Sequence, residues 1–218
     1  MSILCLLEKA DRLPMLRAFM NLSIKSKWRE YRSDVIAHFP VAPLTPVDTQ
    51  RYLKEVDEHY VQDAYHSLSI EGYQVNQALI EKVRKAEWFP ETNEEDREHK
   101  NGLAARGYYE AFLAVKQTLV KILEGGNPGA LMERELPEWY RKLFAPCVAA
   151  GLVQPSDLFG YRGHQVYIRN SRQTPLPTHA LRDAMDAFYS CLKEEKEACV
   201  RAILGHFIFV FIHPYMDG

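Results

Sequence analysis

Hydrophobic side chains recur three and four residues apart over most of the chain, which is the spacing of amphipathic α-helices. The pattern predicts one or two helices within residues 1–38 and further helices at about 46–72, 76–87, 103–124, 132–150, 178–194 and 197–212. In the helix that follows Thr45, we expect Pro46 at the first position, Asp48 in the first turn and Gly72 in a left-handed cap. The predicted fold class is therefore all-α.

One stretch, residues 160–177, has the character of β structure. Val166, Tyr167 and Ile168 favour a strand, and Gly163 and Asn170-Ser171 favour turns. This is enough for one β-hairpin and too little for a sheet. We expect a helical bundle from which this hairpin projects.

The segment FPVAPLTP, Phe39 to Pro46, has three prolines in eight residues and is expected to be extended. It predicts a connection between an N-terminal helical segment, residues 1–46, and a main domain, residues 47–218. The polar stretch 91–102 is expected to be a solvated loop or the start of a helix.

The helix predicted at residues 197–212 is apolar on nearly all sides, so we expect it to be central rather than half-exposed. Pro214 disfavours helical backbone at His213, so we expect the helix to end there. The spacing of His206 and His213 places both side chains near one face of the helix. A histidine that opens into a Pro/Asp/Gly loop lies where a cleft would be. Two other roles stay open: His213 interacting with the helix dipole, and Asp217 forming a turn.

Composition excludes few classes of protein. Of the 218 residues 47% are hydrophobic and 26% charged, as in a globular chain, and the net charge of -2 gives no general attraction to nucleic acid or anionic membranes. The basic cluster between Lys25 and Arg32 is too small to favour a nucleic-acid site. The longest apolar run, residues 207–212, is far shorter than a membrane span, and the first residues lack the features of a secretory leader. We therefore expect a soluble, cytoplasmic protein.

The four cysteines are scattered along the chain. They form no CxxC pair and no Cys/His cluster with the spacing of zinc ligands. Reduced, mostly buried thiols are the expected state.

The sequence His213-Pro214-Tyr215-Met216-Asp217-Gly218 resembles the first half of the signature of the Fic (filamentation induced by cAMP) family. That signature is His-Pro-Phe-x-Asp-Gly-Asn-Gly-Arg, with a second arginine one turn later. Tyr215 replaces the phenylalanine, and the sequence stops before Asn-Gly-Arg. We therefore expect residues 211–218 to be the first half of an active-site loop, truncated within it, rather than a natural ending.

Two further stretches resemble the same family. Ser67-x-x-x-Glu71-Gly72 resembles the inhibitory motif of Fic proteins that carry an N-terminal inhibitory helix, here at about residues 47–72. The segment GYRGHQVYIRNS, residues 160–171, resembles the β-hairpin flap that precedes the last core helices. The three stretches occur in the family's order.

The resemblance implies a protein adenylyltransferase that uses Mg²⁺ and transfers AMP from ATP to a Ser, Thr or Tyr hydroxyl of a target protein. His213 matches the base that takes the hydroxyl proton, a role suited to imidazole because its pKa lies near neutral pH. Asp217 matches the Mg²⁺ ligand, and Gly218 begins the turn that would bind the phosphates.

The resemblance also implies regulation and target binding. Glu71 would occupy the second arginine and repel the γ-phosphate, so the intact protein would be autoinhibited. Ser67 would help to hold the end of the inhibitory helix or would simply be solvated. Val166 and Ile168 would clamp an extended target segment, or they pack onto the core.

Other functions remain open. Within the family, other phosphate-linked transfers and removal of AMP share the signature. From a different class, the chain would be a catalytically incomplete Fic-fold interaction or regulatory module, since the phosphate-binding half of the signature is missing. A transcription regulator that binds DNA through residues 1–38 is the third alternative. Assembly into a homo-oligomer is compatible with the sequence.

Overall fold

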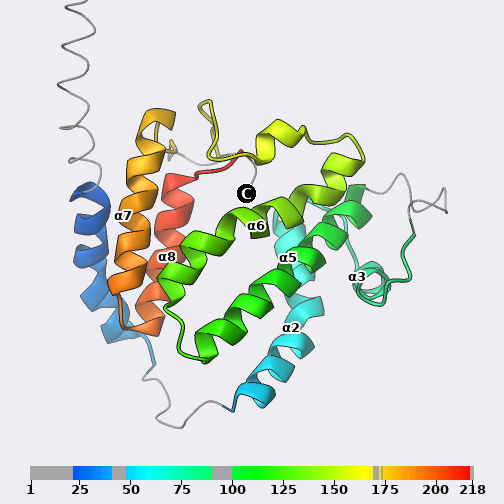
Figure 1. The fold of residues 1–218 in the computed structure, drawn as a ribbon, viewed down its shortest axis with the longest axis horizontal. Helices are drawn as coiled ribbons and strands as arrows, with labels where there is room; N and C mark the ends of the chain where they lie inside the picture. Colours follow the sequence, from blue (N-terminus) through cyan, green and yellow to red (C-terminus); the bar gives the residue numbers. More distant parts are fainter. Residues whose placement is uncertain (1–21, 41–47, 90–99, 169–171, 173, 217–218) are drawn as a thin grey trace, which may run out of the picture. The chain divides into compact units, whose positions relative to one another are not determined.

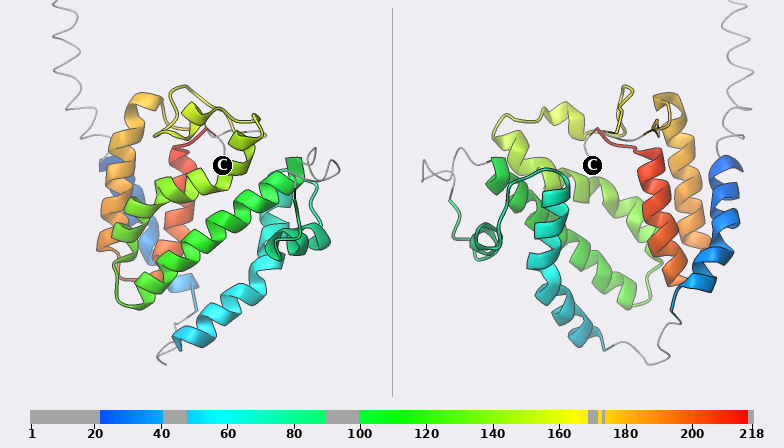
Figure 2. Two further views of the ribbon diagram at one scale, coloured as in Figure 1. Left: turned by 45° about the vertical axis from the view of Figure 1, so that its right-hand side comes forward. Right: turned by 180° about the vertical axis from the view of Figure 1, so that it is seen from behind.

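The computed structural model describes residues 22–40, 48–89, 100–168, 172 and 174–216. Its elements are a helix of residues 22–38, α2 (Thr49–Ile70), α3 (Gln77–Arg84), α5 (Lys100–Leu123), α6 (Pro128–Ala149), two short 3-10 helices, η1 (Pro155–Leu158) and η2 (Thr178–Ala180), then α7 (Leu181–Glu194) and α8 (Ala198–Ile212) (Figures 1 and 2). The described residues contain no strand, and the all-α prediction is confirmed. None of the described helices is long and apolar enough to cross a membrane.

The chain divides into two compact units. We call residues 1–43, 127–133 and 160–218 the terminal unit, and residues 44–126 and 134–159 the central unit. One boundary between them falls within the proline-rich segment at 39–46.

In the central unit, α2 begins and ends through identifiable caps. Asp48 accepts a hydrogen bond from the Arg51 N–H at 3.0 Å, so it is the N-cap and not a first-turn residue as predicted. Pro46 lies outside the described residues. Gly72 has φ +86°, which confirms the predicted left-handed cap.

The core of the central unit is built on one face of α2. Tyr60, Ala64 and Leu68 are buried at four-residue intervals, the spacing that places side chains in one row. They belong to one cluster with Ile80 and Val83 of α3, Leu103, Ala104 and Ala105 of α5, and Val75, Trp88 and Cys147. At Gly107 of α5, an added Cβ would lie 1.9 Å from the carbonyl oxygen of Leu143, so this crossing requires glycine.

The start of α6 differs from the prediction by four residues. The helix begins at Pro128, within the GGNPG stretch that was expected to be a connection. Asn127 accepts a hydrogen bond from the Ala130 N–H at 2.9 Å, and Pro128 occupies the first position. Asn-Pro therefore caps this helix instead of separating it from the preceding one.

In the terminal unit, α7 and α8 lie side by side and are joined by residues 195–197 (Figure 2). Four α8 side chains at regular spacing are buried, namely those of Val200, Leu204, Ile208 and Ile212. On the other side of α8, Ile203, Phe207 and Val210 are 46%, 51% and 42% exposed. The prediction that this helix is central rather than half-exposed is therefore wrong, because the described neighbours cover one of its faces.

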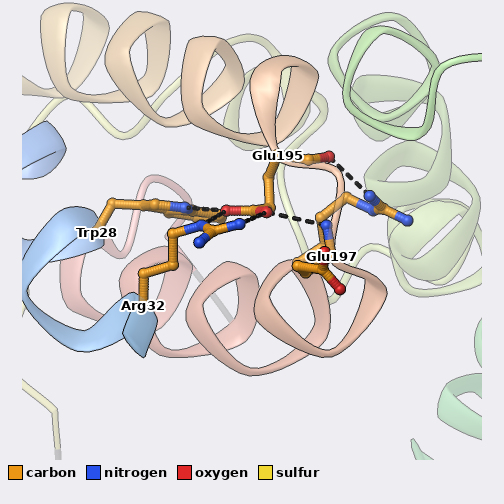
Figure 3. A network of polar contacts seen from close by, with 5 residues as sticks. Trp28, Arg32, Glu195 and Glu197 are labelled. Atoms are coloured by element: carbon orange, nitrogen blue, oxygen red, sulfur yellow. Dashed lines mark hydrogen bonds and ion pairs between the residues drawn. The ribbon is translucent and has the colours of Figure 1, made fainter. Parts of the chain in front are cut away.

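A buried carboxylate attaches the helix of residues 22–38 to the turn between α7 and α8 (Figure 3). Glu195 accepts hydrogen bonds from Trp28 Nε1 at 3.1 Å, from Arg32 Nε and Nη2 at 2.8 and 3.1 Å, and from the Glu197 N–H at 2.9 Å. Its carbonyl accepts a further one from Arg201 at 2.7 Å. Burial acts to raise the pKa of Glu195, but these hydrogen bonds outweigh burial and lower it from 4.5 to about 2.

We expect Glu195→Ala to lower the free energy of unfolding by about 3 kcal/mol at pH 7, because one pKa unit corresponds to about 1.4 kcal/mol. A folded-state pKa below the unfolded value gives stability that is present above about pH 5 and is lost as the pH falls toward 2. Urea denaturation at several pH values should therefore show the two proteins converging in acid.

The control is Glu197→Ala, since the Glu197 side chain is exposed and its backbone N–H is kept. This variant should remain within about 0.5 kcal/mol of the unsubstituted protein. A loss at Glu195 that does not change with pH would contradict the assignment.

Candidate active site

His213 lies at the end of α8 in an unusual backbone conformation. Its φ and ψ are +49° and 68°, in the left-handed region, and its N–H donates a hydrogen bond to the Phe209 carbonyl at 2.8 Å. The helix thus ends before Pro214, as predicted. A left-handed conformation costs a residue with a Cβ about 1–2 kcal/mol, so the surrounding structure must hold it. His213 is half-buried, whereas His206 of the same helix is exposed.

Arg162 supplies much of that support. It is only 4% exposed, and its Nε donates to the His213 carbonyl at 2.7 Å. Its Nη1 donates to the His164 carbonyl at 3.0 Å and its Nη2 to the carbonyl of Leu176. The backbone N–H of Arg162 donates to the Pro214 carbonyl at 2.8 Å.

Sequence reasoning did not single out Arg162. A lone arginine between Tyr161 and Gly163 has the sequence character of a surface residue, and arginine is rarely buried. Its acceptors are carbonyl groups, which every residue has, so no pattern of side chains marks them. Burial lowers the pKa of Arg162, but an arginine side chain keeps its proton at any physiological pH.

Aromatic side chains surround the residue after Pro214. Tyr215 is buried, and the centre of its ring lies 6.0 Å from that of Tyr161 and 6.4 Å from that of Phe209. Burial raises the pKa of both the Tyr161 and the Tyr189 hydroxyl. The tyrosine that departs from the Fic signature therefore lies where an aromatic ring packs well.

The predicted hairpin is not shown in residues 160–168, 172 and 174–177, which contain no strand. Gln165 donates through Nε2 to the carbonyl of Pro175 at 3.0 Å, where a backbone ladder would need N–H donors that prolines lack. The exposure of the side chains nevertheless alternates along residues 166–168. Val166 and Ile168 are half-buried and Tyr167 between them is 78% exposed. Asn170-Ser171 lies outside the described residues.

The residues that resemble the inhibitory motif end α2 in the central unit. Glu71 is exposed and forms the C-cap, where its N–H donates to the Ser67 carbonyl at 3.2 Å. Ser67 Oγ accepts a hydrogen bond from the Tyr108 hydroxyl at 3.1 Å, and the same hydroxyl lies 2.6 Å from Asp63. Burial and the Asp63 contact raise the pKa of Tyr108 to about 12. Ser67 is thus half-buried and has a side-chain partner on α5.

Asp217 and Gly218, the residues matched to the metal and the phosphates, lie outside the described residues. In the part of the chain that the structure describes, no group of three or more His, Cys, Asp or Glu side chains could hold a metal ion. The described part of the candidate site thus comprises His213, Arg162 and the segment around Val166 and Ile168, all in the terminal unit.

Comparisons of this chain with protein-family models, with curated proteins and with solved structures find no match.

The backbone conformation of His213 can be tested by comparing two variants that both remove the imidazole. We expect His213→Gly to be about 1 kcal/mol more stable than His213→Ala, because glycine adopts φ +49° without the cost of a Cβ. Chemical denaturation of both variants measures the difference. A more stable alanine variant would show that His213 is not held in the left-handed region.

Proposed function

We propose that this protein is a protein adenylyltransferase of the Fic class, which transfers AMP from ATP to a Ser, Thr or Tyr hydroxyl of a target protein. The observation that carries the proposal is His213: a half-buried imidazole at the end of a helix, on a backbone tied down by a buried guanidinium. Its place in the sequence His-Pro-Tyr-Met-Asp-Gly supplies the family and the reaction.

His213 acts as the general base in this reaction. The target's hydroxyl oxygen attacks the α-phosphorus of ATP, the bond to the β-phosphate oxygen breaks, and pyrophosphate leaves. The hydroxyl proton passes to the imidazole as the new P–O bond forms. A base held in place for such a transfer contributes about 10²–10⁴-fold to the rate.

The resemblance implies Mg²⁺ bound by Asp217, which would neutralise charge on the phosphates. Gly218 would contribute the first backbone N–H of the phosphate-binding turn. The target's segment binds along residues 165–168, where the half-buried Val166 and Ile168 contact it from one side. The exposure of Tyr167 supports an accessible surface at this segment.

Incubation of the full encoded protein with ATP and Mg²⁺ should add the mass of AMP to a target or to the protein itself. We expect His213→Ala to lower this transfer at least 100-fold, because the base is lost. The matched control is His206→Ala, which removes an exposed imidazole of the same helix and should leave transfer unchanged. Undiminished transfer by His213→Ala would refute the proposed mechanism. Absence of transfer by the unsubstituted protein would instead favour the interaction module.

Glu71 regulates this activity in the proposal. Its carboxylate is exposed at the end of α2 and forms no ion pair with the described residues. A negative charge that approaches the γ-phosphate site repels ATP from the productive pose, and about 1.4 kcal/mol of such repulsion corresponds to a tenfold effect.

We expect Glu71→Gly and Glu71→Gln to raise self-labelling with radioactive ATP by roughly tenfold. Because the glutamine variant changes the charge and keeps the shape, it separates charge repulsion from the greater backbone freedom of glycine. Glu58→Gln, at an exposed position of the same helix, is the control. Equal labelling of all four proteins would exclude autoinhibition by Glu71.

A further inference from the structure

Arg162 is a buried cation whose acceptors are all backbone carbonyls. Its three guanidinium hydrogen bonds go to His213, His164 and Leu176, and among the described residues it forms no ion pair. A desolvated charge is tolerated only when its donors are satisfied, so these carbonyls are held in the positions that the guanidinium requires. The interaction is therefore rigid, in contrast to an exposed ion pair.

Two consecutive carbonyls accept from the same residue. The side chain of Arg162 binds the carbonyl of His213 at 2.7 Å, and its backbone N–H binds that of Pro214 at 2.8 Å. The peptide planes on both sides of Pro214 are thereby fixed. Together with the bond from the His213 N–H to Phe209, they define the left-handed backbone at His213 and the direction in which its Cβ points.

The same guanidinium also holds the segment proposed to bind the target. The acceptor carbonyl of His164 lies two residues before Val166, and that of Leu176 precedes η2. One planar group thus links the backbone of the candidate base to the backbone of this segment. Lysine could not replace it, because an ammonium group is a point donor without the planar geometry of the guanidinium.

We propose that Arg162 is a positioning residue for the reaction: it fixes the His213 imidazole in the orientation needed for proton abstraction. The inference rests on the proposed function and goes beyond it, since nothing in the His-Pro-x-x-Asp-Gly pattern includes Arg162. A displaced base retains its chemistry but loses the alignment that makes proton transfer efficient, so the rate falls and nucleotide binding does not.

The first test is steady-state AMP transfer by Arg162→Lys. We expect kcat to fall about 10- to 100-fold, while the KM for ATP stays within about threefold. The matched control is Arg201→Lys. Arg201 also belongs to the terminal unit, and its guanidinium donates a hydrogen bond to the backbone carbonyl of Glu195, which this variant loses. The control should lose stability and keep kcat. An unchanged kcat in Arg162→Lys, or an equal fall in the control, would overturn the proposal.

The second test does not require AMP transfer. Modification of each histidine by diethyl pyrocarbonate is followed by peptide mass spectrometry in the unsubstituted protein and in Arg162→Lys. We expect His213 to react several-fold faster once its backbone is released and the exposed His206 to react at the same rate. An unchanged or slower rate at His213 would overturn the positioning role. If the unsubstituted protein transfers no AMP, the proposed function fails. The modification rate then tests by itself whether Arg162 holds His213 in place.

Arg162→Met serves both tests if the lysine variant does not fold. Methionine fills much of the same space without placing an unpaired charge in the interior. The expected and the contradicting results are those given for lysine. The rates are compared at a temperature at which the denaturation curves show each variant to be fully folded.

Discussion

The buried guanidinium of Arg162 imposes the constraint on which the geometry of the candidate site depends. A charge removed from water must have its donors met, and here backbone carbonyls from three stretches of the terminal unit meet them. Because the guanidinium is planar, its acceptors are fixed relative to one another. The site is therefore built from backbone positions that one side chain determines, and His213 takes its left-handed conformation within that cluster.

A second buried charge has a comparable effect elsewhere in the terminal unit. Glu195 receives donors from the helix of residues 22–38 and from the start of α8, as Arg162 provides donors to the end of α8. Apolar packing along α8 does not fix the direction of the chain where it enters and leaves the helix, since hydrophobic contact is not directional. The hydrogen bonds of the two charges supply that direction. They also give the helix of residues 22–38 a structural role, which the sequence alone did not reveal.

The sequence predicted local structure well, and it did so where the cause is local. Helical periodicity located the helices, Gly72 marked the end of α2, and Pro214 marked the end of α8. The errors arose where a pattern has two physical outcomes. A helix that is apolar on all sides was expected to be central, yet Ile203 and Phe207 of α8 are exposed. Hydrophobicity favours burial of a side chain, but it does not determine whether another element packs against that side chain. The β-favouring residues 166–168 predicted a strand, but the nearby prolines offer no donors for a ladder.

In the candidate site, too, some residues could be predicted from the sequence and others could not. His213 could be found because its imidazole side chain and the residues that follow it form a recognisable pattern. Arg162 could not, because its partners are backbone carbonyl oxygens, and every residue carries such an oxygen. Ser67 is an intermediate case: its place one turn before Glu71 was evident, whereas its partner Tyr108 lies 41 residues away along the chain. Residues marked by their own side-chain chemistry can thus be found from a sequence more easily than residues whose partners are backbone atoms, and the structure contributes most at the second kind.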